Sequence, residues 1–193
     1  ERRQTRNSFV SAVAIAELMF HYTVRSIRTT HRNAFVAIAI NLLQVAIMML
    51  VFTLLMTMLG MRSAPLRGDF FLFLLSGIFL YMTHIRTFRS VTGAAGATSG
   101  LMNHAPMTTA VSITSAALSV LYIQVLSIII ALTAYHALWK PVSFVEPVAA
   151  FAMLLLAWLS GLAIGLIFKS ISPWFPEAMG PLTRLYIRAN MIF

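Results

Sequence analysis

Residues 34–61 read AFVAIAINLLQVAIMMLVFTLLMTMLGM and contain no charged side chain. An uninterrupted apolar run of about 20 residues is typical of a helix that crosses a membrane. Residues 147–168 form a second window without charge. The chain as a whole is 60% apolar and 10% charged, whereas a soluble domain carries about 25% charged residues. The sequence therefore predicts an all-α integral membrane protein.

The remaining apolar runs outline a single transmembrane domain over residues 1–193. We expect spans at about 34–59, 69–86, 109–134 and 148–168, followed by a partial helix at 181–193. Asp69 stands where it could cap the second span. Three prolines and a glycine in residues 169–181 predict that no continuous helix crosses this segment. Within it, Pro176 followed by the acidic Glu177 fits a helix start.

Polar residues before the first span follow a helical pattern over about 8–32. Spacings of four, four, three and four residues place them on one stripe: Glu17, His21, Arg25, Arg28 and Arg32. A basic amphipathic helix of this kind lies in the membrane interface, with its arginines toward the lipid headgroups. The alternative is an ordinary juxtamembrane anchor. Both place the N-terminus on the cytoplasmic side.

The distribution of basic residues supports this orientation. The net charge is +9, which in a soluble protein would suggest nucleic acid, but arginines in a membrane protein mark its cytoplasmic side. The expected inner segments hold eleven basic residues, namely Arg2, Arg3, Arg6, Arg25, Arg28, Arg32, Arg86, Arg89, Lys169, Arg184 and Arg188. The expected outer loops hold three, namely Arg62, Arg67 and Lys140. We therefore expect membrane lipid, not nucleic acid, around this chain.

Several kinds of chemistry have no support in the sequence. There is no cysteine, so neither a disulfide nor a thiolate metal site is expected. The chain has no glycine-rich phosphate loop ending in Gly-Lys-Ser/Thr, no carboxylate pair placed for acid–base catalysis, and no histidines at metal-ligand spacing. We expect no enzyme activity, cofactor or metal.

A few polar and aromatic residues inside the spans are candidates for a channel lining. Asn41 and Gln44 are the only strongly polar side chains of the first span. They should avoid lipid, either through hydrogen bonds between helices, which we favour, or by facing a transport path. Phe73 and Tyr81 belong to an aromatic second span, where rings either stack on sugars or contact lipid.

The fourth span carries Gly161-x-x-x-Gly165, a spacing that lets two helix backbones approach closely. The motif fits dimerisation of two chains. It fits packing within one chain at least as well.

The connector at residues 86–108 differs from the apolar runs on either side. Glycines loosen its middle, and it ends in a cluster before the third span: Leu101, Met102, Asn103, His104 and Pro106. This cluster resembles the first cytoplasmic coupling segment of ABC transporter permeases, in the branch of type-2 exporters that exports capsular polysaccharide and O-antigen. The order of elements from about residue 9 to 193 resembles that family as well.

The resemblance implies a multi-pass permease of the bacterial cytoplasmic (inner) membrane that forms a homodimer and binds two separate ABC ATPase subunits. The connector cluster would contact the ATPase, although His104 also fits an ordinary solvated loop histidine. Glu177 matches an acidic residue in the family's second, shorter cytoplasmic contact. The implied cargo is a lipid-linked polysaccharide. Members of the family continue through the rest of a fifth span and a sixth, so residues 1–193 would be part of a longer permease.

A second hypothesis assigns no transport activity to the chain. The chain also fits a structural or accessory subunit of a larger membrane complex. Association with an ABC ATPase would favour the permease, and stable association with an unrelated complex would favour the accessory subunit.

Overall fold

The described residues of the computed structural model are Glu17 and residues 34–58, 69–94, 109–138, 141–142 and 146–192. Over these ranges the chain forms helices and no strand: α2 (Ala34–Met58), α3 (Phe70–Gly93), α4 (Thr109–Leu138), α5 (Pro147–Ile171) and α6 (Pro176–Ile192). The predicted all-α class is confirmed. The predicted interface helix at 8–32 lies outside the described residues, apart from the exposed Glu17.

Four of these helices are long and apolar enough to cross a membrane, with 24 to 30 residues each. At 1.5 Å per residue, 24 residues reach about 36 Å, more than the hydrocarbon core of roughly 30 Å. The chain is therefore a multi-pass membrane protein.

The second span is longer than the sequence indicated. We expected it to end near residue 86, but α3 continues to Gly93. Hydropathy marks where the apolar segment ends, whereas the helix continues for as long as its backbone hydrogen bonds are satisfied. At its other end the expected cap is present, since the Asp69 carboxylate accepts a hydrogen bond from the Phe71 backbone N–H at 3.1 Å.

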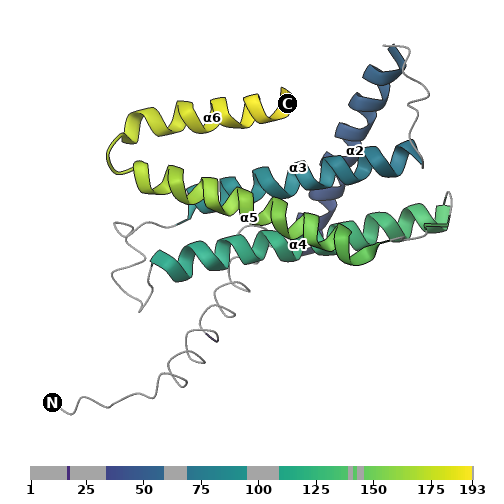
Figure 1. Ribbon diagram of the computed structural model, residues 1–193, viewed down its shortest axis with the longest axis horizontal. Helices are drawn as coiled ribbons and strands as arrows, with labels where there is room; N and C mark the ends of the chain where they lie inside the picture. The colour runs from purple at the N-terminus through teal and green to yellow at the C-terminus, as the bar shows by residue number, and fades with distance from the viewer. Residues whose placement is uncertain are drawn as a thin grey trace.

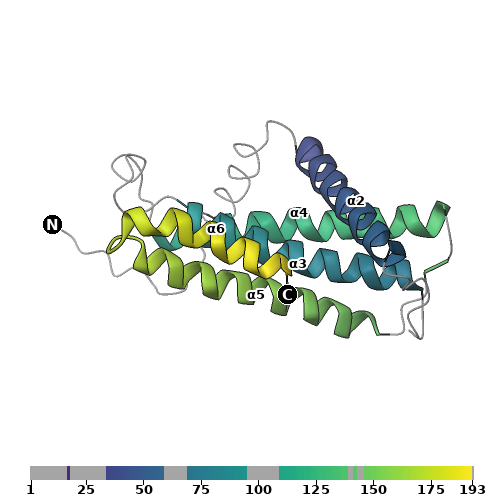
Figure 2. The ribbon, with the colours of Figure 1, turned by 90° about the horizontal axis from the view of Figure 1, so that it is seen from above.

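Helix α3 is the centre of the bundle. It contacts α2, α4 and α5, and α2 crosses the others at a steep angle (Figures 1 and 2). A core of Val45, Met49, Leu75, Ile78 and Phe79 fills the space between α2 and α3. Helix α6 turns back along α5 after a short break, so the last two helices form a hairpin (Figure 1).

The closest helix crossing is between α3 and α5, and it decides the role of the Gly161-x-x-x-Gly165 motif. Both glycines are buried. A Cβ on Gly161 would lie 2.4 Å from the backbone oxygen of His84, and one on Gly165 would lie 2.9 Å from the Val91 side chain. The motif therefore serves packing within one chain, because its surface is already occupied by α3.

The start of α6 also differs from the expected partial helix at 181–193. The helix begins at Pro176, the residue that fits a helix start, and continues through Pro181. Proline suits the first helical position because the N–H it lacks has no partner there. Pro181 lies inside the helix, where it removes the intrahelical hydrogen bond to the Glu177 carbonyl, and the helix continues past it to Ile192.

Candidate functional site

The candidate site lies where α3 and α5 end and α6 begins. Lys169, in the last turn of α5, donates hydrogen bonds from Nζ to the backbone oxygen of Thr92, at 3.2 Å, and to that of Ala94. Carbonyl groups at a helix C-terminus have no partner in their own helix and carry partial negative charge. Lys169 therefore caps α3 from a neighbouring helix and joins the ends of α3 and α5.

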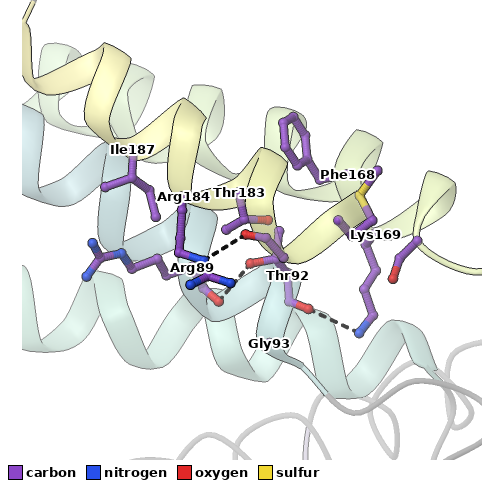
Figure 3. A pocket seen from close by; sticks show the side chains of 11 residues that line it. Arg89, Thr92, Gly93, Phe168, Lys169, Thr183, Arg184 and Ile187 are labelled. Carbon is purple, nitrogen blue, oxygen red and sulfur yellow. Dashed lines mark hydrogen bonds between the residues drawn. The ribbon is translucent and has the colours of Figure 1, made fainter. Parts of the chain in front are cut away.

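A pocket of about 480 Å³ opens beside this cap, between the last turns of α3 and α5 and the first turns of α6. Figure 3 shows Lys169 at one side of the pocket and Arg89 and Arg184 at the other. Hydroxyl groups of Thr92, Ser172 and Thr183 belong to the same lining. No acidic residue lines this pocket among the described residues.

The three cations differ in what they bind. Lys169 is half-buried and is occupied by the end of α3. Arg184 is exposed and donates from Nε to the Gly180 carbonyl oxygen of its own helix at 3.3 Å. Arg89 is exposed and donates no hydrogen bond to a described residue. Two guanidinium groups thus keep most of their donors available beside the pocket.

An aromatic cluster fixes α6 against α3 and α5 next to the pocket. The Phe88 ring is fully buried and lies 4.6 Å from the Tyr186 ring and 5.1 Å from the Phe168 ring, measured between centroids. His84 bridges the same helices, with Nδ1 at 2.8 Å from the Ser160 hydroxyl and Nε2 at 2.7 Å from the Tyr186 hydroxyl. The position of α6, and hence the shape of the pocket, depends on these contacts.

Asn41 and Gln44 each bond to another helix. The fully buried Asn41 donates from Nδ2 to Gln124 Oε1 at 3.1 Å and to Ser127 Oγ at 2.7 Å on α4. Gln44 accepts a hydrogen bond from Arg86 on α3. The hydrogen bonds between helices that we favoured are present for both residues, and Asn41 is fully buried within this chain.

The other candidate residues are not gathered at one place. Phe73 is 60% exposed on α3, and Tyr81 is partly buried on the same helix. Glu177 is exposed in the first turn of α6. Two groups lie outside the described residues: the connector cluster of Leu101, Met102, Asn103, His104 and Pro106, and the interface residues His21, Arg25, Arg28 and Arg32.

Sequence reasoning missed the roles of Lys169 and His84. Lys169 counted only as one of the inner basic residues, although a cation in the last turn of a helix often binds helix carbonyls. His84 shows no metal-ligand spacing in the sequence, and the structure finds no metal-binding cluster within the described ranges. The signal for His84 is an ionisable side chain inside a span, which requires a partner. Its partners lie 76 and 102 residues away, so the sequence could not identify them.

No protein-family model, curated protein or solved structure matches this chain.

Proposed function

We propose that this chain is the membrane subunit of an ATP-driven ABC exporter. It resides in the cytoplasmic membrane of a bacterium with its N-terminus inside, pairs with a second copy of itself and binds two ATPase subunits. Its cargo is a lipid-linked polysaccharide that passes between the protomers. The chain itself hydrolyses no ATP, because the ATPase subunits carry that reaction.

The main support is the joint between α3 and α5. The connector begins within α3 and continues past Ala94 to the coupling cluster, and Lys169 holds Ala94 and Thr92 to the end of α5. Four residues separate the end of α5 from the start of α6, and Glu177 is exposed in the first turn of α6. The two segments expected to contact the ATPase therefore emerge from one end of the bundle. A displacement of either segment is transmitted to both helices, because α3 and α5 also pack closely against each other at Gly161 and Gly165.

Charge at the two ends of the bundle supports the proposed orientation. Among the described residues, the end with the connector has the basic residues Arg89 and Lys169 at or near the helix termini, together with the acid Glu177 at the start of α6. The opposite end has the two acids Asp69 and Glu146 at the starts of α3 and α5. Basic residues concentrate on the cytoplasmic side of membrane proteins, which supports an orientation with the connector end inside.

Glu177→Gln tests the proposed ATPase contact, with Glu146→Gln as a matched control. Both residues are exposed and lie at the starts of their helices, Glu146 as the N-cap of α5 and Glu177 in the first turn of α6, but at opposite ends of the bundle. We would tag the full-length protein, isolate the ATPase subunits that copurify with it, and measure the ATPase activity of the complex. We expect Glu177→Gln to lower the activity or the yield of complex by about tenfold, the value of one charge-assisted contact of roughly 1.4 kcal/mol, and Glu146→Gln to change neither.

Three outcomes would count against the proposal. Equal effects of the two substitutions would show that Glu177 does not contact the ATPase. Absence of any ATPase from the purified material, with an unrelated membrane complex in its place, would support the accessory subunit instead. The third outcome comes from protease digestion of sealed vesicles: cleavage of the connector and the N-terminus from opposite sides would contradict the proposed orientation.

A further inference from the structure

The pocket between α3, α5 and α6 has the composition of an anion site. Its volume of about 480 Å³ falls in the range of roughly 300–1,000 Å³ that is usual for small-molecule sites. Its lining includes Arg89, Lys169 and Arg184 and no described acid. Three cations around one pocket repel one another unless an anion lies among them, and the repulsion is strongest where water is limited.

The arginines supply donors that suit a phosphate group. Arg89 has no hydrogen-bond acceptor among the described residues, and Arg184 uses only Nε, in a long bond to its own helix. The planar guanidinium group binds phosphate oxygens in pairs, with more geometric specificity than a lysine. The hydroxyls of Ser172 and Thr183 add neutral donors to the lining, whereas the Thr92 hydroxyl already donates to carbonyl oxygens of its own helix.

Lys169 makes the end of α3 less unfavourable for an anion. The C-terminus of α3 would repel an anion through its exposed carbonyl groups, but Lys169 already binds two of these carbonyls. Lys169 therefore weakens the repulsion, while Arg89 and Arg184 provide the attraction.

We propose that this pocket binds a phosphate group of net negative charge, carried either by an anionic membrane lipid or by a soluble phosphate ester. The site lies at the end of spans α3 and α5, where lipid headgroups and the aqueous phase meet. Both sources therefore reach it. Binding here closes the gap between α3, α5 and α6 and so stabilises α6 against the bundle. The inference does not rest on the proposed transport function.

The probes are soluble short-chain phosphatidic acid, the phosphatidylcholine of equal chain length, and inorganic phosphate. Each is titrated into the full-length protein in neutral detergent, and binding is followed by native mass spectrometry and by the thermal unfolding temperature. We expect phosphatidic acid to bind at least about tenfold more tightly than phosphatidylcholine, a difference of roughly 1.4 kcal/mol. Competition by inorganic phosphate shows that a phosphate group binds without an acyl chain, which assigns soluble phosphates as ligands, and failure to compete assigns the site to the lipid headgroup.

Variants separate a built site from general attraction between arginine and phosphate. Arg89→Gln and Arg184→Gln should each weaken phosphatidic acid binding about tenfold or more, as loss of a charged hydrogen-bonding partner does. Arg188→Gln is the matched control, because Arg188 is an exposed arginine one turn further along α6 and outside the pocket lining. Arg184→Lys, which keeps the charge and loses the planar donors, should fall between wild type and Arg184→Gln.

Equal weakening by Arg188→Gln would overturn the site, because surface charge alone would then explain binding. Equal affinities for phosphatidic acid and phosphatidylcholine would overturn it as well. Circular dichroism in the absence of ligand, matching that of the wild type, shows that each variant is folded. The assay contains no ATPase, so its result is independent of whether the chain is an exporter subunit.

Discussion

Replacing Gly161 by alanine is the sharpest test of the α3–α5 joint. The added Cβ would lie 2.4 Å from the backbone oxygen of His84 and 3.1 Å from Cβ of Thr87. The nearer obstacle is backbone, so no change of side-chain rotamer relieves the clash. The two helices must separate by roughly 1 Å to restore ordinary van der Waals contact.

The size of the effect follows from this separation. Overpacking a close-packed interior costs about 1–3 kcal/mol. We expect about 3 kcal/mol, at the upper end, since parting the helices also lengthens the hydrogen bond between His84 and Ser160, which is 2.8 Å long. At about 2–4 °C per kcal/mol for a chain of this size, the unfolding temperature should fall by roughly 6–12 °C.

Thermal unfolding of the purified protein, in one detergent and followed by tryptophan fluorescence, measures this shift. The control is Gly77→Ala on α3, where a Cβ meets nothing within 4 Å. Alanine is favoured over glycine in a helix by about 1 kcal/mol, so the control should be neutral or slightly stabilised. An unfolding temperature for Gly161→Ala as high as that of Gly77→Ala would refute the close crossing. Gly165→Ala should fall between them, because its nearest neighbour is a side chain, that of Val91.

Three further contacts can be tested by the same measurement. Asn41→Ala removes two hydrogen bonds to α4 and should cost about 1 kcal/mol, the usual scale for polar contacts between membrane helices; Thr133→Ala, an exposed position bonded only to its own helix, should cost less than half of that. Tyr135→Phe and Asp69→Asn should show a coupling of about 1 kcal/mol in a double-mutant cycle, because the Tyr135 hydroxyl donates to the Asp69 carboxylate at 2.6 Å, and strictly additive costs would contradict this bond. Trp158→Phe removes the indole bond to a carbonyl oxygen of α4 at 2.9 Å and should cost about 1 kcal/mol, whereas an unchanged stability would place the indole N–H elsewhere.

Membrane class and the number of spans follow from the sequence alone, because a lipid-facing helix must be apolar over its whole length. Residues 34–61 contain no charge, and α2 occupies Ala34–Met58 within them. The sequence also indicates the helix start at Pro176, because proline suits the first helical position and an acid suits the positive end of the helix dipole. The sequence does not predict the end of α3, because Arg86 and Arg89 mark the edge of the apolar segment while the helix continues to Gly93.

The candidate site depended on contacts between distant parts of the chain. The sequence shows that Gly161 and Gly165 permit a close approach but does not say to which helix, and only the packed bundle identifies α3. The sequence likewise does not identify the acceptors of Lys169, which lie 75 and 77 residues away. Nor does it show that Lys169, Arg89 and Arg184 line one pocket. Hydropathy and local turn chemistry depend on near neighbours and can be derived from the order of residues. Which faces meet depends on how all the helices pack together, and that information exists only in the folded chain.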